Sequence, residues 1–363
     1  MIVGLLWLML SAAGEPMLKA QIAACARQGS RYGYIRPDGA WLVRPQFDKA
    51  DVFSEGLARA CKNGKWGFVD ASGKWRIAPR YDDALAFRQN RAPVKIGQKW
   101  GFCDGYGRQV VAPIYDEVGI FSQFRAAVCR DGRWGYIDTS GVEVVPPHFL
   151  NASVFSEGRA RVRTEDGIGF IDLNGMPATP FGYADAYNFI NGRAEVFDGM
   201  HWGWITQDGL TCVPHVFDYT TPFSENLACV SLDDQIVFIN LEGKVVLNLP
   251  YESCGRMSEG RARVGDGIKR GFIDPTGKII VPPIYDDAME FVESRAAVQI
   301  QGKWGFIATD GRRAVPLKYE AVMNFAHGLA AVKLNGLWGF VNPDGRTVIE
   351  HKFSDVSSCH RVY

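Results

Sequence analysis

Hydrophobic and polar positions along this chain repeat with a period of 34 residues. In the stretch KWGFVD at residues 65–70, bulky side chains alternate with other residue types. A period of two is typical of a β-strand with two different faces. The pattern returns without insertion or deletion in ten units, which begin at Arg31, Lys65, Lys99, Arg133, Gly167, His201, Gln235, Lys269, Lys303 and Leu337. A fixed period of this size predicts a repeat architecture.

Each unit contains signals for three strands. The first strand leads into a tight turn that ends in glycine, as at Gly73, and a glycine at this position in all ten units indicates a left-handed backbone. A second strand follows, as at residues 278–281, and we expect it to end at Pro282-Pro283 because proline cannot donate to a ladder. A connector then leads to a third strand, and a turn such as Asn63-Gly64 leads into the next unit.

The sequence therefore predicts an all-β array of ten 34-residue, three-stranded antiparallel meanders. One such sheet cannot bury its aromatic face alone, so neighbouring units are expected to stack. We expect residues 22–363 to form a single array that starts at a third strand and ends inside a connector. Ordinary propellers have 4–8 blades. Ten units leave open a β-propeller-like toroid, a spiral or β-solenoid, and two stacked rings.

Two units depart from the pattern. Unit 167–200 has Ile168 in place of the tryptophan, and unit 235–268 has Ile236 there. Drift in a tolerant array is the favoured interpretation, because nearest-neighbour stability absorbs local variation. The alternative is a functional face or a bend between two sub-arrays.

Residues 1–21 form an apolar N-terminal segment, with an uncharged stretch over residues 1–14. Small residues after the apolar run resemble a signal-peptide cleavage site, although no basic residue precedes it. The run is too short to span a bilayer, and a docked N-terminal helix is the alternative. The protein is expected to be exported to the periplasm or outside if residues 1–13 are a signal peptide, and cytoplasmic otherwise. The eight cysteines contain no close pair, which favours free thiols.

Composition and motifs exclude several function classes. Forty basic residues balance forty acidic ones, so no net field would recruit nucleic acid. The six histidines have no zinc-ligand spacing, and no P-loop, dinucleotide or Gly-x-Ser-x-Gly motif occurs. We therefore predict no catalytic residues, no metal and no cofactor. An acidic residue follows an aromatic one in many units, as at Asp48, Asp82, Asp116, Asp218 and Asp286. We interpret these acids as turn residues that accept backbone hydrogen bonds, rather than as a ring of carboxylates.

Six tryptophans share one repeat position and are the candidate interaction residues. They are Trp66, Trp100, Trp134, Trp202, Trp304 and Trp338. If exposed, they would form a stacking ladder for glycans or an extended peptide. If buried, they belong to the core, and burial is favoured because an aromatic residue two positions on shares the strand face.

These units resemble the WG-repeat (KWG) family of bacterial proteins. The resemblance rests on Lys-Trp-Gly-Phe at residues 65–68, 99–102 and 303–306, on residues 277–288, and on residues 155–160. It covers about residues 22–356 and weakens only in the two units that lack tryptophan. What the resemblance implies is a propeller-like or solenoidal β-repeat that acts as an interaction module, with no shared catalytic residues.

The sequence thus favours a non-catalytic scaffold that presents repeated loops to a protein partner. The alternative is an exported module that binds cell-envelope glycans through exposed aromatic side chains. A hydrolase on the same frame is the weakest of the three hypotheses. The identity of the partner and the oligomeric state stay open.

Overall fold

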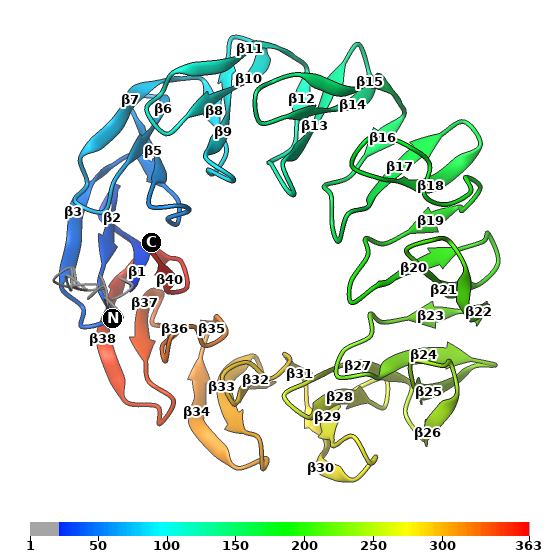
Figure 1. Ribbon diagram of the computed structural model, residues 1–363. Coiled ribbons are helices and arrows are strands. Elements are labelled where there is room, and N and C mark those ends of the chain that lie inside the picture. The colour runs from blue at the N-terminus through cyan, green and yellow to red at the C-terminus, as the bar shows by residue number, and fades with distance from the viewer. Residues whose placement is uncertain (1–21, 363) are drawn as a thin grey trace, which may run out of the picture.

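The Trp-Gly stretch forms the third strand of a four-stranded antiparallel sheet in most units. The computed structural model describes residues 22–362, so the prediction for residues 1–21 lies outside the described residues. Ten such sheets are the blades of one ring (Figure 1). The ten-unit all-β array is therefore confirmed, and its geometry is a single ring rather than a spiral or two stacked rings.

The innermost strand of a blade comes from the connector and was not predicted. Except for β27, it is two residues long. It pairs with the strand that follows it in sequence, except that β39 pairs with β1 (Ile22–Gln28). These strands are β4 (Lys49–Ala50), β8 (Asp83–Ala84), β12 (Glu117–Val118), β16 (Asn151–Ala152), β19 (Asp185–Ala186), β23 (Tyr219–Thr220), β27 (Ser253–Ser258), β31 (Asp287–Ala288), β35 (Ala321–Val322) and β39 (Asp355–Val356).

The next two strands form the hairpin at the centre of each blade. The first of them carries the repeated alanine: β1 (Ile22–Gln28), β5 (Ala58–Lys62), β9 (Arg91–Ile96), β13 (Arg125–Arg130), β17 (Ala160–Thr164), β20 (Arg193–Phe197), β24 (Ala228–Leu232), β28 (Arg261–Gly265), β32 (Arg295–Ile300) and β36 (Ala330–Leu334). The second carries the Trp-Gly stretch: β2 (Arg31–Ile35), β6 (Lys65–Val69), β10 (Lys99–Asp104), β14 (Arg133–Asp138), β18 (Gly167–Ile171), β21 (Trp202–Thr206), β25 (Gln235–Ile239), β29 (Arg270–Ile273), β33 (Lys303–Ala308) and β37 (Leu337–Val341).

The fourth strand lies on the outside of the ring (Figure 1). These outer strands are β3 (Trp41–Phe47), β7 (Trp75–Tyr81), β11 (Gln109–Tyr115), β15 (Glu143–Phe149), β22 (Thr211–Phe217), β26 (Val245–Leu249), β30 (Ile279–Tyr285), β34 (Arg313–Tyr319) and β38 (Thr347–Phe353). A last short strand, β40 (His360–Arg361), pairs with β1.

The expectation that the second strand ends at Pro282-Pro283 is wrong. Strand β30 continues through both prolines to Tyr285, and its pairing with β29 shifts register between Arg270 and Phe272. An outer strand tolerates proline because one side of it has no partner strand, and the shift is a β-bulge. At the bulge the outer backbone lies directly over the glycine of the Trp-Gly pair. In the second blade, a Cβ placed on Gly67 would lie 2.8 Å from the backbone nitrogen of Pro79.

The core lies between neighbouring blades. Phe68 of one blade is buried against Phe87 of the next, with ring centroids 4.7 Å apart in an edge-to-face arrangement. The same contact recurs at other junctions, for example between Phe102 and Phe121 at 5.2 Å. Edge-to-face pairs of this kind stabilise a core beyond the area that they bury. Each junction is therefore a separate small core, as a nearest-neighbour array requires.

The two units without the tryptophan are the irregular ones. In unit 167–200 the outer strand is missing, and only isolated bridges join Ile168 to Tyr183 and Ile171 to Pro177. In unit 235–268 the innermost strand β27 is six residues long and has a register shift between Cys254 and Met257. The ring continues through both units, so neither marks a break into sub-arrays (Figure 1).

Candidate functional site

One face of the ring carries two kinds of turn side by side. The connector turn ends where the alanine strand begins, and the Asp-x-x-Gly turn follows the Trp-Gly strand. The register places them at the same end of a blade, because Arg91 at the start of β9 is paired with Asp104 at the end of β10. We call this end the turn face. The opposite end carries hairpin turns such as Asn63-Gly64.

Side chains of the connector turns hold the turns of the next blade. The Glu55 carboxylate accepts hydrogen bonds from the backbone N–H groups of Gln89 at 2.6 Å and Asn90 at 2.8 Å. Glu157 holds Asn191 and Gly192 in the same way, at 2.7 Å each. Several of these turn residues have a positive φ, for example Glu55 at 52°. Because most of these turns are capped by the preceding one, the loops of the turn face are held in one conformation.

Arginine side chains close most of the blade junctions on this face. Arg91 donates from Nε to the carbonyl of Thr139 in the next blade at 2.8 Å, and from Nη1 to the carbonyl of Asn90 at 2.9 Å. The same two bonds, to the residue 48 positions on and to the preceding residue, are made by Arg125, Arg159, Arg261 and Arg295. At five junctions, therefore, a guanidinium joins neighbouring blades by donating hydrogen bonds to two backbone carbonyls.

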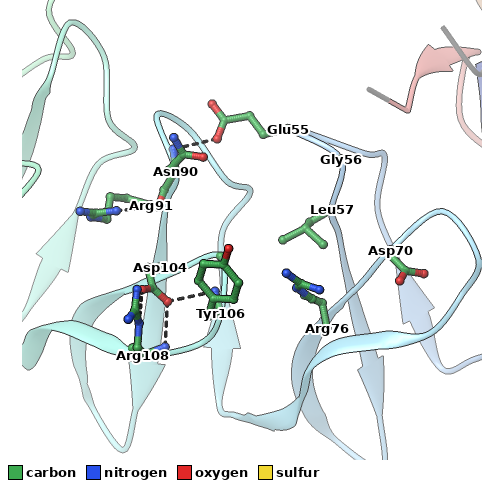
Figure 2. A pocket seen from close by; sticks show the side chains of 11 residues that line it. Glu55, Gly56, Leu57, Asp70, Arg76, Asn90, Arg91, Asp104, Tyr106 and Arg108 are labelled. Atoms are coloured by element: carbon green, nitrogen blue, oxygen red, sulfur yellow. Dashed lines mark hydrogen bonds and ion pairs between the residues drawn. The ribbon is translucent and has the colours of Figure 1, made fainter. Parts of the chain in front are cut away.

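The junction between the second and third blades lacks this arginine and contains a pocket. Leu57 stands 34 residues before Arg91, and Gly105 stands 34 residues before Thr139, so both partners of the bridge are replaced. A pocket of about 420 Å³ opens there, with Leu57 on one side and Tyr106 on the other (Figure 2). Gly105 also lines this pocket. A Cβ placed on Gly105 would meet nothing within 4 Å, so the space beside it is open.

Charged side chains line the pocket, and most of them are already paired. Arg108 donates to Asp104 at 2.7 Å, and the other carboxylate oxygen of Asp104 accepts from the backbone of Tyr106 and Arg108 at 2.9 Å. Burial opposes ionisation of Asp104, but these bonds outweigh it and lower its pKa. The same holds for Asp70. Burial opposes its ionisation, but hydrogen bonds from Ser72 and from the backbone of Lys74 outweigh burial and lower its pKa.

Tyr106 is the most exposed aromatic side chain of the pocket. Its ring is 69% exposed, and the guanidiniums of Arg76 and Arg108 lie 5.0 Å and 5.3 Å from its centroid. Arg76 is itself exposed. A second hollow beside the first is lined by Asp70, Arg76 and Tyr106 together with Trp75. The pocket thus offers carbonyl and carboxylate acceptors, an aromatic ring and one unpaired guanidinium.

The six predicted tryptophans lie elsewhere. Each is half-buried on its Trp-Gly strand and faces the aromatic residue that ends the outer strand, as Trp66 faces Tyr81. They are therefore neither an exposed ladder nor fully buried core. Among residues 22–362 no ring contact joins two of these six tryptophans. A role for them in binding stays a prediction.

Four of the five acids predicted to accept backbone hydrogen bonds in turns do so, whereas the carboxylate of Asp218 lies 4.0 Å from His201. Asp82 accepts from the backbone N–H of Gly97 at 2.7 Å, and Asp116 from that of Asp131 at 2.9 Å. Asp48 and Asp286 accept from the equivalent groups, and each of the four also pairs with a basic residue. Their pairing explains why they do not form a free ring of carboxylates.

The expectation of free thiols is wrong for two cysteines. Cys229 and Cys254 form a disulfide that joins two neighbouring blades, with their Cα atoms 6.2 Å apart. The remaining six are free. In this ring, residue i of an alanine strand lies against residue i+25 of the next blade, as Arg161 does when it donates to the carbonyl of Ala186. The sequence alone did not reveal this contact.

No cluster of three or more His, Cys, Asp or Glu side chains suited to a metal occurs within residues 22–362. Over the same residues, no helix has the length and apolar character needed to cross a membrane.

Ten antiparallel blades in one ring define a ten-bladed β-propeller. The WG containing repeat matches ten consecutive segments of this sequence, namely residues 32–66, 66–100, 100–134, 134–167, 168–199, 202–235, 238–267, 271–304, 304–338 and 338–358. The chain belongs to this repeat family. No curated protein matches the sequence.

Solved structures resemble the ring at low sequence identity. A structure titled as a eukaryotic initiation factor superposes with a TM-score of 0.56 and 10% identity, covering 94% of this chain and 98% of that one. Hsv2 of Kluyveromyces marxianus gives a TM-score of 0.37 at 9% identity, covering 67% and 98%. The dihydro-heme d1 dehydrogenase NirN gives 0.42 at 13% identity, covering 98% and 78%. The first of these likenesses supports the propeller fold and nothing more specific.

Proposed function

We propose that this protein is a non-catalytic scaffold that binds a protein partner through the turn face of its ring. The observation that carries the proposal is the set of inter-blade hydrogen bonds that fixes the turns, such as those from Gln89 and Asn90 to Glu55. Loops that are held before binding lose little conformational entropy when a partner arrives. A rigid array of such loops suits the recognition of an extended surface.

The chemistry of the pocket supports binding rather than catalysis. A general acid at neutral pH needs a raised pKa, whereas the pKa values of Asp70 and Asp104 are lowered by their hydrogen bonds, which outweigh burial. Glu195 has a raised pKa, but its side chain is only 5% exposed and is not accessible to a substrate. Asp70 and Asp104 therefore hold their own turns in place.

The proposal is tested by capturing partners from the cells that make the protein. The full chain is immobilised, and bound proteins are identified by mass spectrometry and then reconstituted from purified components. We expect a near-stoichiometric partner whose binding is lost in Tyr106→Ala, on the turn face. The matched control is Lys62→Ala, an exposed residue at the opposite end of the blade. Equal loss in both variants, or no partner in repeated captures, would contradict the proposal.

The alternative, an exported glycan-binding module, is favoured by one aromatic cluster and one disulfide. Tyr187 is 54% exposed and stacks on Trp202 with ring centroids 5.3 Å apart, and Phe197 lies 5.2 Å from the same ring. Exposed stacked aromatics bind sugar rings. The disulfide between Cys229 and Cys254 is of a kind that persists in oxidising compartments.

Two measurements separate this alternative from the scaffold. Soluble cell-envelope glycans are titrated while tryptophan fluorescence is recorded, and the N-terminus of the mature protein is read by mass spectrometry. A saturable signal that disappears in Tyr187→Ala, together with cleavage after the apolar segment, would support the glycan-binding module. An unchanged spectrum and an intact Met1 would exclude it.

A further inference from the structure

We infer that the pocket between Leu57 and Gly105 binds an arginine side chain of the protein partner. This inference rests on the proposed scaffold function, for which it specifies a feature of the partner. It follows from a comparison of this junction with the five junctions at which an internal arginine bridges two backbone carbonyls, and with a sixth at which Arg193 donates to the carbonyl of Leu241. The partner's guanidinium would complete the bridge that the chain itself makes elsewhere in the ring.

The acceptors for a guanidinium are already in place. At each closed junction, Nε and Nη1 of the arginine donate to two backbone carbonyls, at 2.9 Å and 3.0 Å for Arg125. The corresponding carbonyls at the open junction belong to Gly105 and Gly56, and both residues line the pocket. Within residues 22–362, neither carbonyl accepts a hydrogen bond. Arginine suits such a pair of acceptors because its donors form a rigid planar fork.

The space for the guanidinium is also in place. Leucine has no donor and is shorter than arginine, and Leu57 lines the pocket without filling it (Figure 2). Glycine at 105 leaves the space beside it open, since a Cβ there would meet nothing within 4 Å. Leu227 also stands at an arginine position, but the residue 48 positions on is Pro275 rather than glycine. At the Leu57 junction, the arginine donors that would bind the two carbonyls are missing, and the space beside Gly105 is open to a side chain from outside.

The charges around the pocket balance, so the unpaired backbone carbonyls are the feature that favours a hydrogen-bond donor. Arg91 is committed to the carbonyls of Thr139 and Asn90, and Arg108 is paired with Asp104. The six charged side chains that line the pocket are three acids and three arginines, so their formal charges sum to zero. The ring of Tyr106 already lies 5.0 Å from the guanidinium of Arg76 and 5.3 Å from that of Arg108, so a partner side chain would bind through the carbonyls.

The test is a calorimetric titration of the full chain with the capped tripeptide acetyl-Gly-Arg-Gly-amide. The same peptide with citrulline, which has nearly the same shape but no charge, and peptides with lysine or glutamate serve as probes. We expect the arginine peptide to bind at least about tenfold more tightly than the citrulline peptide, because hydrogen bonds from a charged donor are the stronger ones. The glutamate peptide is expected not to bind.

Variants of the chain locate the site. Leu57→Arg supplies an internal guanidinium, so we expect it to fold with an unchanged or higher melting temperature and to lose at least about tenfold in affinity for the arginine peptide. The matched control, Leu227→Arg, adds the same side chain at another junction and is expected to bind as the original protein does. Gly105→Thr copies Thr139, narrows the opening, and provides a second test that does not depend on the folding of the first variant.

The outcomes distinguish this inference from the function on which it rests. Equal binding of the arginine and citrulline peptides, preference for glutamate, or full binding by Leu57→Arg would overturn the arginine site. If a captured protein partner binds Leu57→Arg as well as it binds the original chain, the scaffold stands and the arginine site fails. If the arginine peptide binds as expected but repeated captures find no protein partner, the scaffold fails.

Discussion

Ala26, on the first strand of the ring, is paired with Val356, near the other end of the chain. Ala26 and Val356 occupy the same repeat positions as Ala60 and Ala50, which are paired in the same way inside the second blade. The backbone N–H of Ser357 donates to the carbonyl of Cys25 at 2.9 Å, and the hydroxyl of Ser357 accepts from the N–H of Cys25 at 3.0 Å. The C-terminal segment therefore supplies the innermost strand of the first blade and closes the ring.

This closure predicts that truncation after Phe353 destabilises the whole ring. The segment buries Val356, Cys359 and Val362, and two valines with a cysteine contribute about 5 kcal/mol to the free energy of unfolding. The truncated protein should unfold at lower urea concentration and, because β1 gains an unpaired edge, should associate in solution. Urea unfolding with sedimentation measurements checks both effects. An unchanged midpoint in a monomeric protein would show that closure is not needed.

A pair of point variants separates closure from simple loss of core. Val322→Ala removes the same side chain at the equivalent position one blade earlier, where the innermost strand is held by chain connectivity on both sides. Val356→Ala removes it from the closing strand. If closure limits stability, the variant at 356 should lose more stability than the one at 322 and should also expose the C-terminus to proteolysis.

The ten units and their turns could be predicted because their signals are local. Each signal spans only a few residues: the alternation around Phe68, the turn glycine at Gly73 and the turn acid at Asp82. The innermost strands were missed because two residues such as Asp83 and Ala84 have no pattern of their own, and only pairing with β9 makes them a strand. The choice of a ring over a spiral depends on contacts between the chain ends, which no local pattern contains.

The candidate pocket was missed because it comes from two residues 48 positions apart. Neither Leu57 nor Gly105 is unusual alone, and the signal is that arginine occupies the first position in six other units. The disulfide was missed for a similar reason, since Cys229 and Cys254 are 25 residues apart and belong to no motif. In both cases the ring geometry creates the site, so the comparison of equivalent positions is useful only after the fold is known.

The glycine of the Trp-Gly pair predicts a large difference between two alanine variants. At Gly67, a Cβ would lie 2.8 Å from the backbone of Ala78 and Pro79, so the outer strand must move. We expect Gly67→Ala to lower the free energy of unfolding by about 3 kcal/mol, as overpacking against a backbone does. Gly105→Ala is the control, because its Cβ meets nothing and its change should stay within about 0.5 kcal/mol. Urea unfolding of both variants is the measurement, and similar midpoints would contradict the bulge contact.

The disulfide predicts a thiol count and a redox-dependent stability. Under denaturing conditions, thiol titration should find six free thiols before reduction and eight after it. Reduction opens a loop with a sequence separation of 25, which lowers the free energy of unfolding by about 3 kcal/mol. The double variant Cys229→Ser with Cys254→Ser is the control, since reductant should not change its melting temperature. Eight free thiols in the untreated protein would rule the bond out.

Glu195 predicts an unusual dependence of stability on pH. Its side chain is 5% exposed, one carboxylate oxygen has no hydrogen-bond partner among the described residues, and burial raises its pKa from 4.5 to about 7. Between these two values the folded protein keeps a proton that the unfolded chain releases. The contribution of this group to stability is therefore complete below pH 4.5 and declines as the pH rises to about 7.

Glu195→Gln isolates this contribution from the other ionisable groups. Glutamine has the shape of the protonated acid and does not ionise, so the variant should match the original protein near pH 4.5 and be more stable above pH 7. The difference in the free energy of unfolding at pH 8 should approach about 3 kcal/mol, because each pKa unit corresponds to about 1.4 kcal/mol. Urea unfolding from pH 4.5 to 8 measures it. A constant difference across this range would mean that Glu195 titrates normally in the folded ring, and that the burial of its carboxylate is relieved in solution.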